Sequence, residues 1–241
     1  GCDSTAILNL TINQSDTSYT SITACDSVVW NGTTYTQSGT YTYSAGGGTI
    51  TDSVSLLSYC PSHPSSLLIA SPSAIIEEVI LNGDNNNINN NTTGVADFYE
   101  DYTASMYSDM TLGQPYSISI TLNGIAASGN SLNNSGGKVF IDYNIDGDFI
   151  DPGEEIGVIP YRTTATVGVP EVINFTVPVT AVTGVTRMRV VSQYQSTPNP
   201  SAIGPCDAPA SGSWSEPWYG ATEDYSIVLN TPSLAAGGCD S

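Results

Sequence analysis

The residues Tyr35-Thr36-Gln37-Ser38-Gly39-Thr40-Tyr41-Thr42-Tyr43 decide the fold class, because aromatic or β-branched side chains alternate here with small polar ones. This period of two is typical of a β-strand with one buried face. No long window of the chain keeps apolar residues at the helical period without interruption by Gly, Pro or β-branched residues. The sequence therefore predicts an all-β chain.

Similar apolar and β-branched runs recur along the chain and predict further strands. The predicted strands are residues 7–12, 28–35, 49–57, 75–81, 116–122, 138–143, 171–177, 185–194 and 224–229. Asn31-Gly32, inside the second of these, is a hairpin turn signal. Residues 82–93 carry a run of asparagines, and we predict an exposed loop there because the side chains are too polar to pack.

The charge of the chain limits its partners. The 241 residues include 23 acidic and four basic side chains, for a formal net charge of −19. This excludes a nucleic-acid partner bound through its phosphates and argues against anionic membrane surfaces. No apolar stretch approaches the roughly 20 residues that span a bilayer, so we expect no membrane insertion. The first residues lack the pattern of a signal peptide, and we expect a mature chain or an excerpt.

An acidic stretch around Gly147 has the spacing of a cation-binding loop. Calcium takes about six to eight oxygens, and side-chain ligands at positions 1, 3 and 5 with Gly at position 6 open an EF-hand-type loop. The candidate ligands for Ca²⁺ are Asp142, Asn144, Asp146, Asp148, Asp151 and Glu154. The preceding residues Val139-Phe140-Ile141 predict an entering strand, which places this loop in a β protein.

The loop departs from the EF-hand pattern where the last ligand is expected. Position 12 is Gly153, while Glu154 lies one residue later and Asp151 two residues earlier. Asp142, Asn144 and Asp146 are therefore stronger candidates than either closing carboxylate. A solvated acidic turn is the alternative interpretation.

The cysteines indicate a repeating, disulfide-linked chain. Gly-Cys-Asp-Ser occurs at residues 1–4 and again at 238–241, which suggests one period of a tandem array with Cys239 as the start of the next unit. Four cysteines then remain per period and allow three pairings, of which we favour Cys2–Cys25 and Cys60–Cys206. Zinc is disfavoured because no CxxC is present and His63 is the single histidine. Disulfides place the protein outside the cytosol.

Local patterns between residues 59 and 230 resemble the GEVED domain of large secreted and surface proteins of Bacteroidota-type bacteria. The patterns are residues 98–103, 141–154, 184–190 and 219–226. The last one is the signature that gives the family its name. Ala221 replaces its first glutamate, while Glu223, Asp224 and Tyr225 are present.

The N-terminal part is similar to a second kind of sequence. Residues 25–35 and 38–42 match the pattern CDSxxWNGxxYxxSGxYT, which resembles the short repeats of giant surface adhesins. The two resemblances imply a small Ig-like β module at 1–58 and a jelly-roll or Ig-like β-sandwich at 59–230. Residues 231–241 are then a linker and the start of the next repeat. The two resemblances also imply export, display on the bacterial cell surface and no family-wide catalytic activity.

Two of the four cations lie close together in the sequence. Arg187 and Arg189 are two residues apart on a predicted strand, so both side chains project from one face. We expect them to meet carboxylates, with Glu223 and Asp224 as candidates. A solvent-facing arginine pair is the alternative.

We expect no enzyme. His63 lies in a proline-bounded loop, where a histidine is usually a surface residue rather than a base. Paired carboxylates could hydrolyse glycosides, but those of the acidic loop are better explained as metal ligands.

Other patterns suggest contacts with sugars. Trp214, Trp218 and Tyr219 could form a platform for surface glycans, although a role in covering the core beside Cys206 is favoured. Triplets containing Ser4, Ser27 and Ser53 resemble the Asp-Ser/Thr-apolar O-glycosylation signal of such bacteria.

The overall expectation is a calcium-stabilised, non-catalytic repeat unit of a large secreted adhesin or extracellular filament. It would contact adjacent repeats. The alternative is a carbohydrate-binding module or accessory domain of a secreted hydrolase.

Overall fold

The structure is a computed structural model, which describes most of the chain between residues 19 and 232. The described residues are 19–25, 28–30, 32–45, 48–62, 75–92, 98–123, 134–163, 168–195, 197–206, 208–209, 215–216 and 220–232. The chain divides into two compact units, Gly1–Leu57 and Ser58–Ser241. Each unit is described by itself.

The N-terminal unit is built from short strands. Strands β1 (Tyr19–Cys25), β5 (Gly48–Leu57) and β4 (Gly39–Ala45) form one sheet in that order, with β1 parallel and β4 antiparallel to β5. Strands β2 (Val28–Trp30) and β3 (Thr33–Tyr35) form a separate hairpin. Gly32 follows β2 with a φ of 79°, as the turn requires. The predicted hairpin is confirmed.

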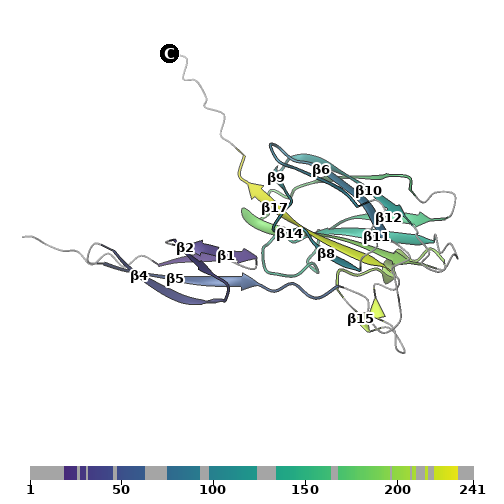
Figure 1. The fold of residues 1–241 in the computed structure, drawn as a ribbon. Coiled ribbons are helices and arrows are strands. Elements are labelled where there is room, and N and C mark those ends of the chain that lie inside the picture. Colours follow the sequence, from purple (N-terminus) through teal and green to yellow (C-terminus); the bar gives the residue numbers. More distant parts are fainter. Residues whose placement is uncertain are drawn as a thin grey trace, which may run out of the picture. The chain divides into compact units, whose positions relative to one another are not determined.

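The C-terminal unit contains two larger sheets that lie in separate layers (Figure 1). The first has the order β13 (Glu171–Thr176), β10 (Pro115–Asn123), β6 (Ile75–Asn82) and β7 (Asn87–Asn91). The second has the order β12 (Glu155–Arg162), β11 (Ser135–Ile141), β14 (Gly184–Tyr194), β17 (Ala221–Asn230) and β8 (Tyr99–Asp101), and β9 (Tyr107–Thr111) also pairs with β17.

Smaller elements complete this unit. Strands β15 (Ala208–Pro209) and β16 (Ser215–Glu216) form a two-stranded sheet, and Pro200–Ala202 is a 3-10 turn. The described residues contain no α-helix, and no helix among them could cross a membrane. The predicted all-β class is confirmed.

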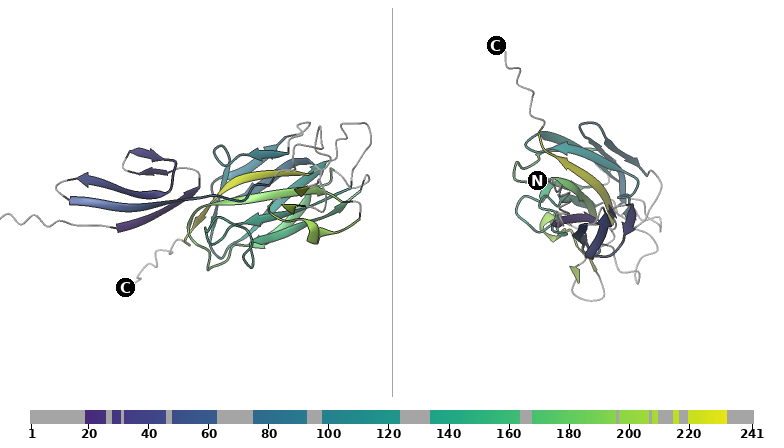
Figure 2. Two further views of the ribbon diagram at one scale, coloured as in Figure 1. Left: turned by 90° about the horizontal axis from the view of Figure 1, so that it is seen from below. Right: turned by 90° about the vertical axis from the view of Figure 1, so that its left-hand side faces the viewer.

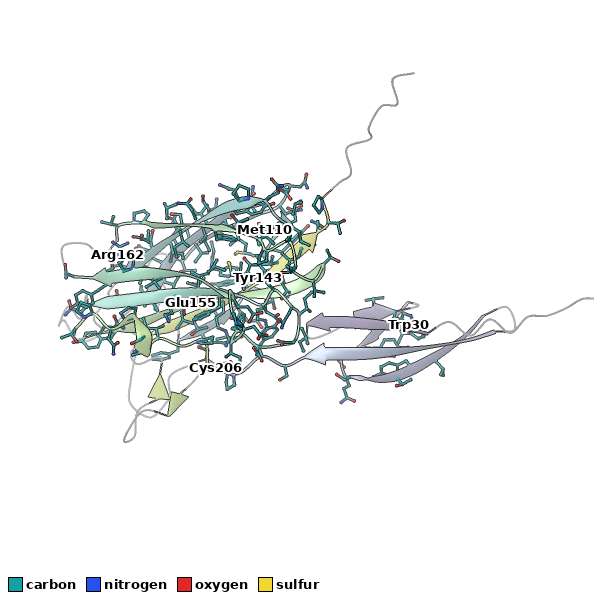
Figure 3. All side chains as sticks on the ribbon, turned by 180° about the vertical axis from the view of Figure 1, so that it is seen from behind. Trp30, Met110, Tyr143, Glu155, Arg162 and Cys206 are labelled. Atoms are coloured by element: carbon teal, nitrogen blue, oxygen red, sulfur yellow. A yellow bond between two sulfur atoms is a disulfide. The ribbon has the colours of Figure 1, made fainter. Side chains whose placement is uncertain are left out.

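The core lies between the two sheets, whose strand axes are roughly aligned (Figure 2). Ile118 and Ile120 of β10 and Val139 and Ile141 of β11 are fully buried there, because alternate residues of a strand project to the same face. Met110 from β9 belongs to the same cluster (Figure 3). The predicted β-sandwich is therefore confirmed.

The prediction of an exposed loop at residues 82–93 is wrong. Residues 87–91 form strand β7, which pairs antiparallel with β6. Ile88 and Asn90 point inward and are buried, while the residues at 87, 89 and 91 are exposed. The buried Asn90 is tolerated because its Nδ2 donates a hydrogen bond to the Tyr225 hydroxyl at 2.7 Å. The predicted strand at 7–12 lies outside the described residues.

Candidate functional site

The predicted acidic loop connects the neighbouring antiparallel strands β11 and β12. Ile141 N–H donates to the Glu154 carbonyl at 2.9 Å and brings the two ends of the loop together. The backbone has positive φ at Ile145 (56°), Gly147 (95°) and Gly153 (101°). Glycine adopts this conformation at little cost, so the two glycines allow the chain to turn back on itself twice within a short segment.

Asp142 stabilises the first half of the loop from inside. Its side chain is fully buried, and Oδ1 accepts hydrogen bonds from Ile145 N–H at 2.6 Å and Asp146 N–H at 3.4 Å. Oδ2 accepts from Gly147 N–H at 3.0 Å and from the Tyr59 hydroxyl at 2.7 Å. One carboxylate therefore fixes the direction of several backbone amides.

Glu154 does the same at the second half. Its Oε1 accepts from Tyr143 N–H at 3.0 Å and its Oε2 from Asp151 N–H at 3.2 Å. Burial raises the pKa of Glu154 to about 7, and the negative charges of Asp142 and Asp151 raise it further against the effect of these two hydrogen bonds. A nearby positive charge would favour its ionised form.

The remaining predicted ligands meet at the outer edge of the loop. Carboxylate oxygens of Asp146, Asp148 and Asp151 all lie within 4.8 Å of one another. Asn144 Nδ2 donates to Asp146 Oδ2 at 2.9 Å and to Asp151 Oδ2 at 2.6 Å. Among the residues that the structure describes, no salt bridge joins these three carboxylates to a basic side chain.

These donors fit a calcium ion. Calcium prefers carboxylate and amide oxygens, and a half-turn of the Asn144 amide would present its oxygen where the NH₂ group now lies. The fold thus brings four of the six predicted ligands together and gives Asp142 and Glu154 additional bonds to the loop backbone. A carboxylate has about four acceptor positions. The two hydrogen bonds to Glu154 leave room for metal ligation, whereas the four to Asp142 occupy its positions and make it a support of the loop backbone in this conformation.

A buried ion-pair network lies on the outer face of the six-stranded sheet. Arg189 binds Asp224 through two hydrogen bonds, Nε to Oδ1 and Nη2 to Oδ2, both 2.7 Å long. Arg187 Nη1 lies 3.1 Å from Asp224 Oδ2, and the Tyr99 hydroxyl donates to the same oxygen at 2.9 Å. The Asp224 carboxylate, fully buried, therefore interacts with two arginines and one tyrosine.

The predicted partner Asp224 is thus confirmed, and the predicted partner Glu223 is wrong. Neighbouring residues of a strand project to opposite faces. Asp224 lies opposite Arg189 in the β14–β17 register and shares its face, so Glu223 points into the core.

Residues 58–62, here called the strap, cover this network. The strap includes Cys60, whose predicted disulfide with Cys206 is confirmed (Figure 3). Arg189 Nη1 donates to the carbonyls of Cys60 and Pro205, each at 2.8 Å. The Arg187 guanidinium lies 4.4 Å from the centre of the Tyr59 ring, a cation–π distance. The strap, the disulfide and the arginines therefore form one connected structure.

Inside the sandwich, Glu223 belongs to a second polar cluster that the sequence did not reveal. The Tyr225 hydroxyl donates to Glu223 Oε2, and Tyr225 stacks on Tyr102 with ring centres 5.4 Å apart. Burial raises the pKa of Glu223 to about 8, and the nearby charge of Glu100 adds to this against the hydrogen bond from Tyr225. Asn90 joins the same cluster from the opposite sheet.

Several predicted site residues lie outside the described part of the chain. They are Trp214, Trp218, Tyr219, Cys2, Cys239, Ser4, Ser27 and His63. Cys25 and Ser53 belong to β1 and β5, but their side chains are not described. The Cys2–Cys25 pairing, the sugar platform and the O-glycosylation sites remain predictions.

Comparison with known proteins identifies a domain in the C-terminal unit. Residues 137–228 match the family model of the GEVED domain, which confirms that part of the resemblance. The match includes the acidic loop, both arginines and Asp224. No curated protein matches the chain.

Proposed function

We propose that this GEVED-containing chain is a structural, non-catalytic repeat unit of a large secreted cell-surface adhesin or extracellular filament, stabilised by calcium. The observation that carries the proposal is the acidic loop between β11 and β12, where Asn144, Asp146, Asp148 and Asp151 converge. Calcium at this place would offset the repulsion of the clustered carboxylates and join the two halves of the loop.

Three features support a load-bearing role. The Cys60–Cys206 disulfide closes a loop with a sequence separation of 146 residues. The arginine–Asp224 network joins the strap to two central strands of a sheet. The repeated Gly-Cys-Asp-Ser sequence favours adjacent units of the same protein as partners. A unit in a tandem chain resists local opening best when its peripheral segments are tied to its core, and bound metal adds stability by mass action.

The same features support the proposed extracellular location. Disulfides persist in oxidising compartments, and extracellular calcium is abundant enough for weak sites to fill. The strong negative charge of the chain also favours a medium with divalent cations. The carboxylates of the loop would serve as ligands and hydrogen-bond acceptors, with no catalytic task.

Thermal unfolding with calcium and with chelator tests the proposal. Calcium at a hundredfold excess over its Kd should stabilise the protein by about 2.7 kcal/mol and raise the unfolding midpoint accordingly. The variant Asp146→Ala should lose most of this rise. Glu77→Gln, which removes one carboxylate of β6 outside the loop, should keep it. A wild-type midpoint that is the same with calcium and with chelator would contradict the metal site.

A further inference from the structure

We propose that the Cys60–Cys206 disulfide controls the calcium affinity of the acidic loop, and that Tyr59 transmits this effect as a positioning residue. The inference rests on the proposed calcium site and assigns a redox regulation to it. Three sets of contacts carry it: those between Tyr59 and Asp142, those around Phe149, and those that keep the strap in place.

Tyr59 contacts the first candidate ligand directly. Its hydroxyl donates to Asp142 Oδ2 at 2.7 Å, on the oxygen that also accepts Gly147 N–H. Asp142 is fully buried, and the other hydrogen bonds to its carboxylate come from amides of the loop itself. Tyr59 therefore links Asp142 to a segment far away in the sequence. If the strap moves away, Asp142 loses this restraint on its orientation.

The strap also packs against the second half of the loop. Phe149 lies between two candidate ligands in the sequence and points inward, with its ring centre 5.0 Å from that of Tyr59. Phe149 and Phe140 belong to a small buried cluster against which Tyr59 packs. The Arg189 guanidinium lies 5.1 Å from the Phe149 ring centre. One side of the loop thus rests on the strap, while four of the candidate ligands, Asn144, Asp146, Asp148 and Asp151, meet at its outer edge.

Besides the disulfide, hydrogen bonds of Cys60 and Ser62 hold the strap in place. The Cys60 carbonyl accepts a hydrogen bond from Arg189 Nη1. Ser62 Oγ and Thr222 Oγ1 lie 2.9 Å apart, and both residues are buried. The disulfide joins Cys60 to Cys206, next to Pro205, whose carbonyl also accepts from Arg189. Without that bond, the strap and the segment around Cys206 can separate independently, and the population with Tyr59 on Asp142 falls.

The redox step is a thiol–disulfide exchange. A dithiol reductant transfers two electrons and two protons to the sulfurs of Cys60 and Cys206, which become thiols, and the reductant becomes its own disulfide. If the closed strap favours calcium binding, bound calcium must favour the closed disulfide by the same factor, because coupling between two sites is reciprocal.

Calcium titration by calorimetry tests the inference on the full 241-residue chain. The oxidised wild type is compared with the double variant Cys60→Ser, Cys206→Ser and with Tyr59→Phe, which removes the hydroxyl and keeps the ring. Coupling energies between sites usually correspond to about 5- to 150-fold in affinity, and we expect the Kd for calcium to rise roughly tenfold in both variants. Matched controls are Cys239→Ser and Tyr107→Phe, which should bind like the wild type.

A second measurement separates positioning from general destabilisation. In the wild type, calcium should shift the equilibrium of the Cys60–Cys206 bond with a dithiol toward the disulfide by the same factor as the change in Kd. In Tyr59→Phe this shift should shrink, although the disulfide is intact. If Tyr59→Phe only destabilised the fold, calcium would shift the disulfide equilibrium of the variant as much as that of the wild type.

The outcomes are distinct for the two proposals. An oxidised wild type that binds no calcium contradicts the proposed function itself. A wild type that binds calcium, with an unchanged Kd in a folded double variant and in Tyr59→Phe, overturns the redox inference alone. Circular dichroism checks that each variant is folded, and Tyr59→Phe decides the question if the double variant is not.

Discussion

Asp224 is the residue on which the buried charges of this protein converge. It interacts with Arg187, Arg189 and Tyr99, and no part of its side chain is exposed. Removal of one partner of a buried ion pair destabilises a protein by more than the intact pair stabilises it, because the remaining charge stays desolvated. Here two arginines would lose their shared carboxylate.

We expect Asp224→Asn to lower the free energy of unfolding by about 3–5 kcal/mol, measured by urea denaturation. The matched control is Glu171→Gln, which removes a carboxylate bound to Arg162 at 2.6 Å on an edge strand. That pair is partly exposed, and its loss should cost no more than about 1 kcal/mol. Equal losses in the two variants would show that the buried network adds nothing beyond a surface pair.

Glu223 gives the protein a pH-dependent stability. Burial raises its pKa to about 8 from the ordinary value of 4.5, so the folded state favours the protonated acid. The stability from this group is therefore fully present below about pH 4.5 and is lost as the pH rises through about 8. Groups around the carboxyl are Glu100, Asn90, Tyr102 and Tyr225, and burial raises the pKa of both tyrosines above 10.

The variant Glu223→Gln should therefore lose less stability than the wild type between pH 5 and pH 9, when urea denaturation is repeated across this range with calcium absent. Glu154 also has a raised pKa, about 7, but it is present in both chains, so their difference reports on Glu223. Parallel stability curves for the two chains would contradict the assignment.

Among the elements, strand β7 shows how a polar sequence can be structural. Asn89 is exposed, whereas its neighbour Asn90 is 5% exposed and donates to Tyr225. We expect Asn90→Ala to destabilise the protein by about 1–3 kcal/mol, because the Tyr225 hydroxyl loses its donor inside the core. Asn89→Ala should change the stability by less than about 0.5 kcal/mol. Thermal unfolding of both variants measures the difference, and similar effects would mean that the position in the strand does not matter.

Two of the strands that were not predicted, β8 and β9, share a cause. β8 and β9 are short segments that pair in parallel with β17, and neither has a clear alternation of apolar residues. Their register depends on β17, whose own residues are far away in the sequence. Propensity and period describe only local preferences, so a strand that forms mainly by pairing with a distant one gives a weak local signal.

At the scale of the whole molecule, the Cys60–Cys206 disulfide links two cysteines that are 146 residues apart in the sequence. A bond that closes a large loop reduces the entropy of the unfolded chain, and removal of a native disulfide from a secreted domain usually costs about 2–5 kcal/mol. The double variant Cys60→Ser, Cys206→Ser should lose this amount in urea denaturation with chelator present. The control Cys239→Ser should show no comparable loss in the free energy of unfolding. If the double variant unfolds with the same free energy as the wild type, the stability of the C-terminal unit comes from its core alone.

The sequence by itself determined the all-β class, most of the central strands, the hairpin at Gly32 and the position of the acidic loop. Each of these depends on short-range patterns, namely alternation, turn residues and ligand spacing. The Cys60–Cys206 pair was one of three possible pairings and was favoured, and Asp224 was one of two candidate partners for the arginines.

The tertiary structure alone decided which face each of these side chains occupies. It placed Asp224 beside the arginines and Glu223 inside the core, because neighbouring residues of β17 point in opposite directions. It also made a strand of the asparagine run and brought Tyr59 to Asp142, 83 residues later in the chain. These outcomes depend on pairing and packing between distant segments, and such contacts have no signature in the local sequence.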